Sequence, residues 1–397
     1  MLTILCVATY FKGEAFLREC HRLGCRVLLL TADTLADAAW PRDAIAEIHT
    51  IPRGAAEADV RRTVGSIARR HAIARVAALD DFDVELGAAM REFLQVPGIG
   101  RTVAARFRDK LAMRTGARRL GIRVPEFTAV FTDADVDAGA ARVDPPWVLK
   151  PRSSAASTGI KKIASRDELW PTLDAAGDDR PLCLLEQFVA GEVYHVDSIV
   201  RNGEVAVAIA SKYARPPMQI AHEGGVFITR RLADQSPEAR ALLETNRTLL
   251  TGFGLVNGAS HTEFIGSPMP DVRVTFLETS ARVGGAYIVD VVEAATGINL
   301  WREWAKVEIA GDEGHYQMPP VGPDSAGIAL CLARQPDPDL SGYTDAEIVM
   351  RIRKHHHAGL IVRSPDAGRV EALLDEYSAR FAHDFLATMP APDRPVE

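Results

Sequence analysis

Residues 184–193 read LLEQFVAGEV, and this stretch decides the fold of the chain. It holds an apolar strand, a Glu-Gln pair, a short apolar hinge and a second carboxylate at Glu192. Upstream, the strand WVLKP at residues 147–151 ends in a lysine, and downstream FLETSARVGG at residues 276–285 carries an acid and then an arginine. A strand-end lysine, a hinge with an acidic partner, and acidic strands followed by an arginine are the parts needed to hold ATP and magnesium.

A run of small residues follows the strand-end lysine. Residues 153–160 read SSAASTGI, and Ile160–Ile163 form a predicted return strand. The backbone N–H groups and hydroxyls of such a loop can wrap a triphosphate closely, because no large side chain stands in the way. We therefore expect a hairpin whose loop closes on phosphates beside Lys150. The alternative for Lys150 is a side chain that extends from the strand end to the surface.

Two acids stand within apolar strands farther along the chain. Glu263 lies in HTEFI, residues 261–265, and Glu278 lies in TFLET, residues 275–279. A hairpin of these strands would place both carboxylates side by side on one face, where like charges repel and a cation resolves the conflict. Carboxylates together with ATP phosphates suit Mg²⁺, and Mn²⁺ can substitute for it. The alternative is a pair of separate, solvent-facing acids.

These segments, in this order and spacing, resemble the ATP-grasp ligases over roughly residues 106–311, and more loosely over the whole chain. The family's phosphate loop has the form K-P-x-x-G-x-x-S-x-G, which is matched here by Lys150, Pro151, Ser157 and Gly159. Serine and alanine replace the other glycines, so we expect a stiffer loop. The family usually carries Glu-x-Asn at its second acid, where this chain has Ser280 in place of the asparagine.

The resemblance implies a set of ATP contacts. Glu186 and the backbone of the residues after it would address the adenine, and Glu192 would bind the ribose hydroxyls, because a carboxylate accepts two O–H hydrogen bonds from a diol. Lys110 would be the second phosphate lysine, although the sequence alone also allows a lysine on a helix surface. The implied ATP-binding residues are Lys110, Lys150, Ser157, Gly159, Glu186, Gln187, Phe188, Val189 and Glu192.

The resemblance also implies the reacting end of the site. Glu263, Glu278 and Ser280 would ligate the metal, with the serine hydroxyl a weaker ligand than the family's amide. Lys150 and Arg282 would be catalytic, since a guanidinium can hold a carboxylate or a transferring phosphoryl group through two hydrogen bonds. The candidates for substrate binding are Arg215, His222, Arg230, Gly284 and Gly285. A solvated loop is the alternative for the stretch that carries Arg215, His222 and Arg230.

The sequence leaves two possible roles open for each of two further polar groups. His195 and Asp197 lie on the same face of the strand after the hinge, and are either structural polar residues or substrate-side groups. The residues DDFD at 80–83 follow an apolar strand of the N-terminal region. They are typical of a helix cap, which we favour, or of a ligand site at the carboxyl edge of an open α/β sheet.

The chain is expected to divide into three regions. Short apolar strands alternate with helices in residues 1–105, which predicts an open α/β domain, and the resemblance implies that this is the Rossmann-like pre-ATP-grasp domain. The resemblance also implies an α+β ATP-grasp domain of two subdomains at residues 106–316, with a lid at about 115–188, and residues 317–397 are expected to form a small C-terminal α/β region. The predicted strands outside the central region span residues 2–7, 26–31, 45–51, 75–79, 326–333 and 359–362, and a final helix spans 366–386.

The bulk composition excludes several classes of protein. A chain of 397 residues is too long for one core and predicts two to four domains. The formal net charge of −7 argues against a general nucleic-acid or membrane-surface binder. No apolar run reaches the roughly 18 residues needed to span a bilayer. The five cysteines include no CxxC pair, which favours reduced thiols and a cytoplasmic location.

These inferences predict an ATP-dependent carboxylate–amine ligase that forms an amide or peptide bond through an acyl phosphate. The expected partners are a small carboxylate, such as an amino acid, and an amine, with no nucleic acid or membrane, and a homodimer is left open. Two alternatives remain at this point. One is a biotin-carboxylase-like enzyme acting on bicarbonate. The other is a catalytically weak, nucleotide-binding regulatory protein, which Ser280 and the glycine-poor loop suggest.

Overall fold

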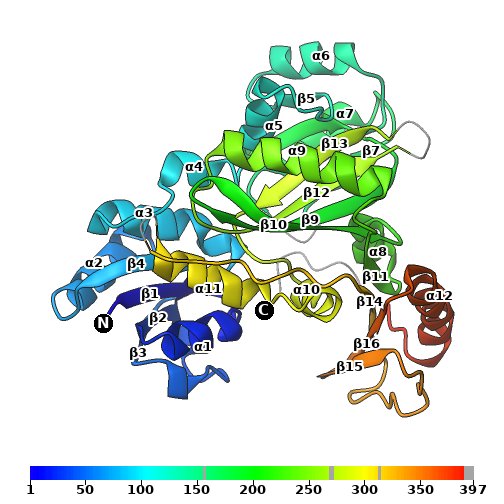
Figure 1. The fold of residues 1–397 in the computed structure, drawn as a ribbon. Coiled ribbons are helices and arrows are strands. Elements are labelled where there is room, and N and C mark those ends of the chain that lie inside the picture. Colours follow the sequence, from blue (N-terminus) through cyan, green and yellow to red (C-terminus); the bar gives the residue numbers. More distant parts are fainter. Residues whose placement is uncertain (155–157, 268–271, 312–313, 389–397) are drawn as a thin grey trace.

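The strands in the described part of the chain form three sheets (Figure 1). The computed structural model describes residues 1–154, 158–267, 272–311 and 314–388. A four-stranded parallel sheet belongs to the N-terminal region, a four-stranded antiparallel sheet to the predicted lid, and an eight-stranded antiparallel sheet to the remainder. No helix within these described ranges is both long and apolar enough to cross a membrane. The mixed α/β architecture confirms the predicted fold class.

The N-terminal sheet has the strand order β3-β2-β1-β4, and all of its strands are parallel. Every residue of β1 is buried, because helices cover both faces of the sheet. Apolar runs of this kind are why the parallel region could be predicted. The elements are β1 (Thr3–Ala8), α1 (Glu14–Arg22), β2 (Arg26–Ala32), β3 (Glu47–Ile51), α2 (Glu57–Ala68), β4 (Ile73–Ala78) and α3 (Val84–Leu94).

The lid sheet has the order β5-β8-β6-β7 and lies within the range predicted for the lid. Leu149 and Leu185 pack with two helices in the lid core. Because strand side chains alternate, Lys150 and Glu186 point to the opposite face, away from those helices. The elements are β5 (Phe127–Ala129), α6 (Asp133–Arg142), β6 (Trp147–Pro151), β7 (Lys161–Ile163), α7 (Leu169–Asp174) and β8 (Cys183–Gln187).

The eight-stranded sheet has the order β13-β12-β9-β10-β11-β14-β16-β15. It runs through the predicted boundary between residues 316 and 317, so the C-terminal strands extend the central sheet. The sequence did not predict β15, because only Ile352 of this edge strand is buried and no alternating pattern marks it. The strands are β9 (Glu192–Arg201), β10 (Glu204–Tyr213), β11 (Phe227–Arg231), β12 (Gly258–Gly266), β13 (Val274–Ser280), β14 (Ser325–Leu332), β15 (Ile348–Lys354) and β16 (His357–Ser364).

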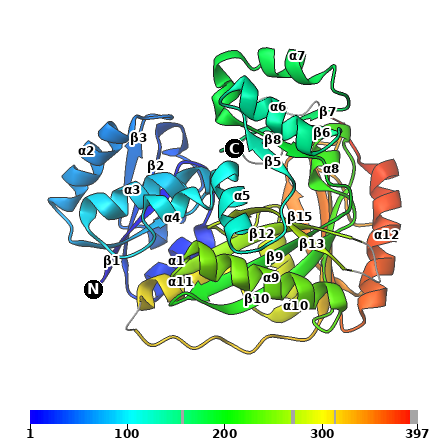
Figure 2. The same cartoon turned by 90° about the horizontal axis from the view of Figure 1, so that it is seen from above.

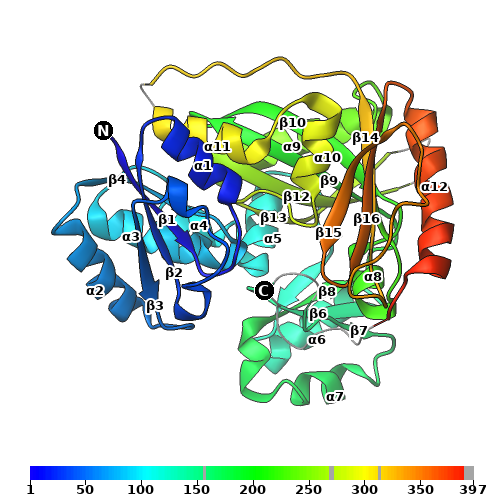
Figure 3. The same cartoon turned by 90° about the horizontal axis from the view of Figure 1, so that it is seen from below.

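Helices cover both faces of this sheet, as Figures 2 and 3 show from above and below. Val196 and Val200 of β9 pack with α9, whereas Ile199 packs with α11 on the other face. His195 and Asp197 share the face of Ile199, since they are separated from it by even steps along the strand. The remaining helices are α4 (Arg101–Ala105), α5 (Lys110–Arg119), α8 (Pro217–Glu223), α9 (Pro237–Phe253), α10 (Ile288–Thr296), α11 (Leu300–Ala310) and α12 (Ala367–Asp384).

Candidate active site

A cavity of about 580 Å³ lies between the lid sheet and the eight-stranded sheet. Lys150 and Glu186 line it from the lid, and Glu263 and Glu278 line it from the edge of the large sheet. Lys110, the first residue of α5, completes this charged wall. Residues that lie far apart in sequence thus meet in one space, which is large enough for a nucleotide.

The lid wall of the cavity contains a buried cluster of three charges. Glu186 forms an ion pair with Lys150 and accepts hydrogen bonds from Arg114, whose Nε lies 3.0 Å from Oε2. Burial alone would raise the pKa of Glu186, but Arg114 and Lys150 hold it below its ordinary value. Burial lowers the pKa of Lys150 to about 8, although Glu186 opposes that shift. The carboxylate of Glu186 therefore forms ion pairs with two cations within the protein, Arg114 and Lys150.

Arg114 is a site residue that the sequence analysis missed. It lies on α5 one helical turn after Lys110, so both side chains leave the same face of the helix. Its side chain is fully buried against Glu186. A cation at this spacing from a predicted phosphate lysine is the signal that could have found it.

The Lys110 side chain points into the cavity and is not on a helix surface. Its Nζ lies 3.2 Å from Oε2 of Glu278 and donates a 2.6 Å hydrogen bond to the carbonyl of Ser154. Burial alone would raise the pKa of Glu278, yet Lys110 and Lys150 lower it to about 2. Glu278 is therefore ionised between two lysines, as a ligand of a divalent cation must be.

The hinge residues Gln187, Phe188 and Val189 all line the cavity. The backbone N–H groups of Gln187 and Phe188 donate to the carbonyls of Glu126 and Pro146, at 2.7 and 3.0 Å. Those two donors are thus used within the protein, in contrast to the implied backbone contacts with adenine. The ring of Phe188 lies 4.2 Å from the Lys162 ammonium and forms an apolar wall of the cavity.

Glu192 stands outside the cavity lining. Its carboxylate accepts 2.7 Å hydrogen bonds from the Tyr194 hydroxyl and the Lys212 ammonium. These two donors hold the pKa of Glu192 below its ordinary value. A ribose contact by Glu192 stays a prediction.

The predicted phosphate loop is described at both of its ends. Ser157 lies outside the described residues. Gly159 has a φ of +74°, and a Cβ there would lie 2.9 Å from Cγ of Pro151, so glycine is required at this turn. The neighbouring Thr158 lines the cavity, and its buried hydroxyl has no hydrogen-bond partner among the described residues. A buried, unpaired hydroxyl at a cavity wall suits a phosphate oxygen.

Glu263 and Glu278 are direct partners in the pairing of β12 with β13. The hairpin therefore places them side by side, as the sequence predicted. Oε1 of Glu263 accepts a 3.0 Å hydrogen bond from the Tyr213 hydroxyl and lies 3.6 Å from Nε2 of His261. Two carboxylates on neighbouring strands and facing the same cavity fit a hard divalent cation.

The residues after Glu278 depart from the predicted arrangement. The hydroxyl of Ser280 donates to Asp81 of the N-terminal region, and Ser280 does not line the cavity. Strand β13 ends at Ser280, so Arg282 lies beyond the strand and does not continue its alternation. Its Nη1 donates to the carbonyl of Val283 at 2.8 Å, while its buried Nε has no hydrogen-bond partner among the described residues.

The candidate substrate residues fall into two groups. His222 of α8 lines the cavity. Arg215 and Arg230 are not lining residues. Arg215 pairs at 3.0 Å with Glu223, which does line the cavity, whereas Arg230 pairs with Glu371 of α12. A substrate role for Arg230 is therefore not favoured by its contacts. Asp80 caps the short turn after β4 by accepting from the backbone N–H of Phe82, as the favoured interpretation predicted.

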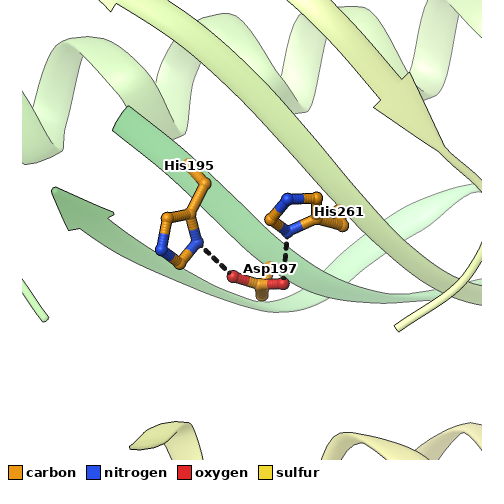
Figure 4. A group of neighbouring side chains, drawn as sticks. All are labelled: His195, Asp197 and His261. Carbon is orange, nitrogen blue, oxygen red and sulfur yellow. Dashed lines mark hydrogen bonds and ion pairs between the residues drawn. The ribbon is translucent and has the colours of Figure 1, made fainter. Parts of the chain in front are cut away.

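Figure 4 shows a group of three buried side chains, His195, Asp197 and His261, and His261 of this group lies beside Glu263. Nδ1 of His195 lies 2.6 Å from one carboxylate oxygen of Asp197, and Nδ1 of His261 lies 2.8 Å from the other. Burial would raise the pKa of Asp197, but the two histidines hold it below its usual range. Burial would lower the pKa of His261, but Asp197 raises it to about 9.

Gly284 packs directly over this group. A Cβ at Gly284 would lie 2.7 Å from Oδ1 of Asp197 and 3.0 Å from Nδ1 of His261. Gly285 is exposed, and no atom beyond its chain neighbours lies within 4 Å of the Cβ position there. Close approach thus explains the first glycine of the predicted pair, but not the second.

Comparison with known sequences finds relatives among ligases. The chain is 26% identical over 233 residues to an L-arginine-specific L-amino acid ligase of Bacillus subtilis. This alignment covers 57% of this chain and 55% of the relative. It is also 34% identical over 111 residues to a D-alanine–D-alanine ligase of Ectopseudomonas mendocina. This alignment covers 27% of this chain and 34% of that relative. The chain thus spans about half and about a third of the length of these two curated relatives. No family model matches the chain.

Solved structures align over nearly the whole chain. An L-amino acid ligase from Bacillus licheniformis aligns with a TM-score of 0.73 and 19% identity, over 97% of this chain and 98% of that one. The biotin carboxylase domain of a Hydrogenobacter thermophilus 2-oxoglutarate carboxylase, solved with MgADP and bicarbonate, aligns with a TM-score of 0.71 and 14% identity, over 97% and 90%. These neighbours are ATP-grasp ligases, and the chain has the ATP-grasp fold. The two curated relatives, from Bacillus subtilis and Ectopseudomonas mendocina, are ligases of amino acids.

Proposed function

We propose that this chain is an ATP-dependent carboxylate–amine ligase that joins an amino acid, or another small carboxylate, to an amine. The observation that carries the proposal is the meeting of two lysines, Lys110 and Lys150, with the paired acids Glu263 and Glu278 in one cavity. Such a set suits a triphosphate and the divalent cation that accompanies it. The amino-acid ligases among the relatives support the choice of substrate class.

The reaction would proceed in two steps. A carboxylate oxygen of the substrate attacks the γ-phosphorus of ATP, so that an acyl phosphate forms and ADP leaves. The amine then attacks the acyl carbon, an amide bond forms, and phosphate leaves with the electron pair of the broken C–O bond. Catalysis of this kind rests on positioning and on neutralising negative charge.

The residues of the cavity have distinct roles in these steps. Glu263 and Glu278 would hold Mg²⁺, or Mn²⁺ in its place, and this cation supplies positive charge beside the phosphates. Lys110 and Lys150 would contact phosphate oxygens, and so would the Thr158 hydroxyl, which has no hydrogen-bond partner among the described residues. Arg282 does not itself line the cavity, but its buried Nε has no hydrogen-bond partner among the described residues, and it would face the transferring phosphoryl group and the substrate carboxylate.

The test is phosphate release from ATP with pooled amino acids as substrates. ADP and phosphate are expected in equal amounts and only when a carboxylate and an amine are both present, and oxygen-18 from the carboxylate is expected in the phosphate. Turnover that needs bicarbonate and no amine would support the carboxylase alternative. The absence of any substrate-stimulated turnover would support a regulatory protein. Formation of AMP and pyrophosphate would contradict the proposal.

A further inference from the structure

A continuous chain of buried polar contacts ends at the predicted metal ligand Glu263. Nε2 of His195 lies 2.7 Å from the hydroxyl of Thr229, and its Nδ1 lies 2.6 Å from Asp197. The other oxygen of Asp197 lies 2.8 Å from Nδ1 of His261, whose Nε2 lies 3.6 Å from Oε1 of Glu263. Asp197 and His261 are direct partners across β9 and β12, and so are His195 and Glu263.

The hydrogen-bonding capacities of these groups fix the orientation of the rings. An ionised carboxylate only accepts hydrogen bonds, so Nδ1 of each histidine must donate to Asp197. The other nitrogen of His261, Nε2, faces Oε1 of Glu263. Because this nitrogen and the Tyr213 hydroxyl both address Oε1 of Glu263, that oxygen is held from two sides. Among the described residues, no hydrogen bond to Oε2 of Glu263 is present, so this oxygen is left for another partner.

We propose that Asp197, acting through His261, and Tyr213 together hold Oε1 of Glu263 so that Oε2 is presented to the divalent cation. Asp197 and His261 are thus positioning residues for the metal site. The inference rests on the proposed function, because it takes Glu263 as a metal ligand. Outer contacts of this kind fix the orientation of ligating carboxylates and commonly change metal affinity 10- to 100-fold when removed.

The packing of Gly284 extends this arrangement toward the reacting end. The backbone at Gly284 lies against Asp197 and His261 so closely that a Cβ there would collide with both. Arg282 stands two residues earlier in the same segment. The carboxylate of Asp197 therefore sets the position of a metal ligand on β12 and supports the segment that carries the predicted catalytic arginine.

A metal ion bound by His195, Asp197 and His261 themselves is the competing interpretation. Their ligand-type atoms all lie within 4.8 Å of one another. However, the carboxylate and the two imidazole N–H groups already satisfy each other, and all three side chains are buried. The group therefore needs no ion to balance its charge, and we interpret it as a hydrogen-bonded network.

The experiment measures Mn²⁺ binding by electron paramagnetic resonance in the presence of a non-hydrolysable ATP analogue. Asp197→Asn and Tyr213→Phe are expected to weaken Mn²⁺ binding about tenfold or more, while the affinity for the analogue without metal stays unchanged. Ser198→Ala is the matched control. It removes a buried 2.9 Å hydrogen bond to Asn246 from the same strand, but on the opposite face, and is expected to leave Mn²⁺ binding unchanged.

The outcomes separate this inference from the proposed function. Folded Asp197→Asn and Tyr213→Phe proteins with wild-type Mn²⁺ affinity would overturn the positioning role. If Asp197→Asn does not fold, Tyr213→Phe decides the question alone, because it removes only one hydroxyl. A wild-type protein that binds no Mn²⁺ with the analogue would overturn the proposed function, and the inference with it. One equivalent of Mn²⁺ bound without nucleotide, and lost in His195→Gln, would assign the metal to the histidine group instead.

Discussion

Lys150 and Glu186 form an ion pair in which each side chain is only 4% exposed. Removing one partner of such a pair usually leaves an uncompensated buried charge, which is strongly destabilising. Here Arg114 also holds Glu186, with 2.9 Å between Nη2 and Oε2, so the acid keeps a cation when the lysine changes. Lys150 can therefore contribute to binding without being the only support of the lid sheet, and its role can be tested in a folded variant.

Lys150→Ala is expected to weaken ATP binding by about 1.5–3 kcal/mol, because it removes a charge-assisted contact to phosphate. Isothermal titration with ATP and Mg²⁺ measures this effect. Lys161→Ala is the control, since Lys161 lies on β7 of the same sheet, is exposed and does not line the cavity. Unchanged ATP affinity in Lys150→Ala would remove the strand-end lysine from the binding site.

Glu278→Gln is expected to leave the protein folded and to abolish most turnover, because neutralising this acid removes half of the predicted metal clamp. The measurement is phosphate release at saturating ATP across a magnesium titration. The variant also loses the 3.2 Å ion pair with Lys110. Lys110→Met therefore serves as a companion variant, which loses that pair but keeps the acid, and its magnesium dependence should shift less. Wild-type activity with an unshifted magnesium dependence in Glu278→Gln would exclude the pair.

Local patterns predicted the parts of the site that lie on strands. The apolar runs around Lys150, Glu263 and Glu278 define strands, and alternation then fixes which way these side chains point. The pairing of Glu263 with Glu278 follows from a hairpin between neighbouring segments. The N-terminal parallel sheet was predictable for the same reason, since β1 is buried on both faces and reads as a continuous apolar run.

Contacts between distant segments could not be predicted in the same way. Ser280 was expected at the metal, but its hydroxyl donates to Asp81, which lies 199 residues earlier in the chain. Arg230 was a candidate for the substrate, but it pairs with Glu371 of α12. Both outcomes depend on how separate regions pack together, and no periodicity within either segment carries that information.

The side chain of Asp83, in the N-terminal region, is expected to make the protein less stable as the pH rises from about 4 to about 7. Burial raises the pKa of Asp83 to about 7, although hydrogen bonds from Thr9 oppose the shift. In this window the folded protein keeps a proton that the unfolded chain has already lost. The contribution of protonated Asp83 to the free energy of unfolding is therefore fully present at low pH. It is lost as the pH rises through the pKa of Asp83 in the folded protein.

Urea unfolding of wild type and of Asp83→Asn across this pH range tests the assignment. The difference in unfolding free energy between the two proteins should change by a few kcal/mol over the window and level off above pH 7, since both states are then ionised. Asp43→Asn is the control, because its carboxyl is largely exposed and forms a surface ion pair with Arg18. A difference that does not vary with pH would contradict a raised pKa for Asp83.

Arg282→Ala is expected to lower turnover much more than it lowers ATP affinity or melting temperature. A salt bridge to an acid such as Glu263 would give this side chain a structural role instead, but within the described residues Arg282 makes no ion pair, and its buried Nε has no hydrogen-bond partner. Folding therefore gains little from this guanidinium. A guanidinium without an acidic partner among the described residues can instead stabilise charge that develops as the phosphoryl group transfers, which lowers the barrier without strengthening ground-state binding. Melting temperature, ATP titration and turnover should be measured together, with Arg230→Ala as the control, because Arg230 pairs with Glu371 away from the cavity. A large drop in melting temperature with unchanged turnover per folded molecule would assign Arg282 to folding, and equal losses in ATP affinity and turnover would place it on the nucleotide and not on the reacting atoms.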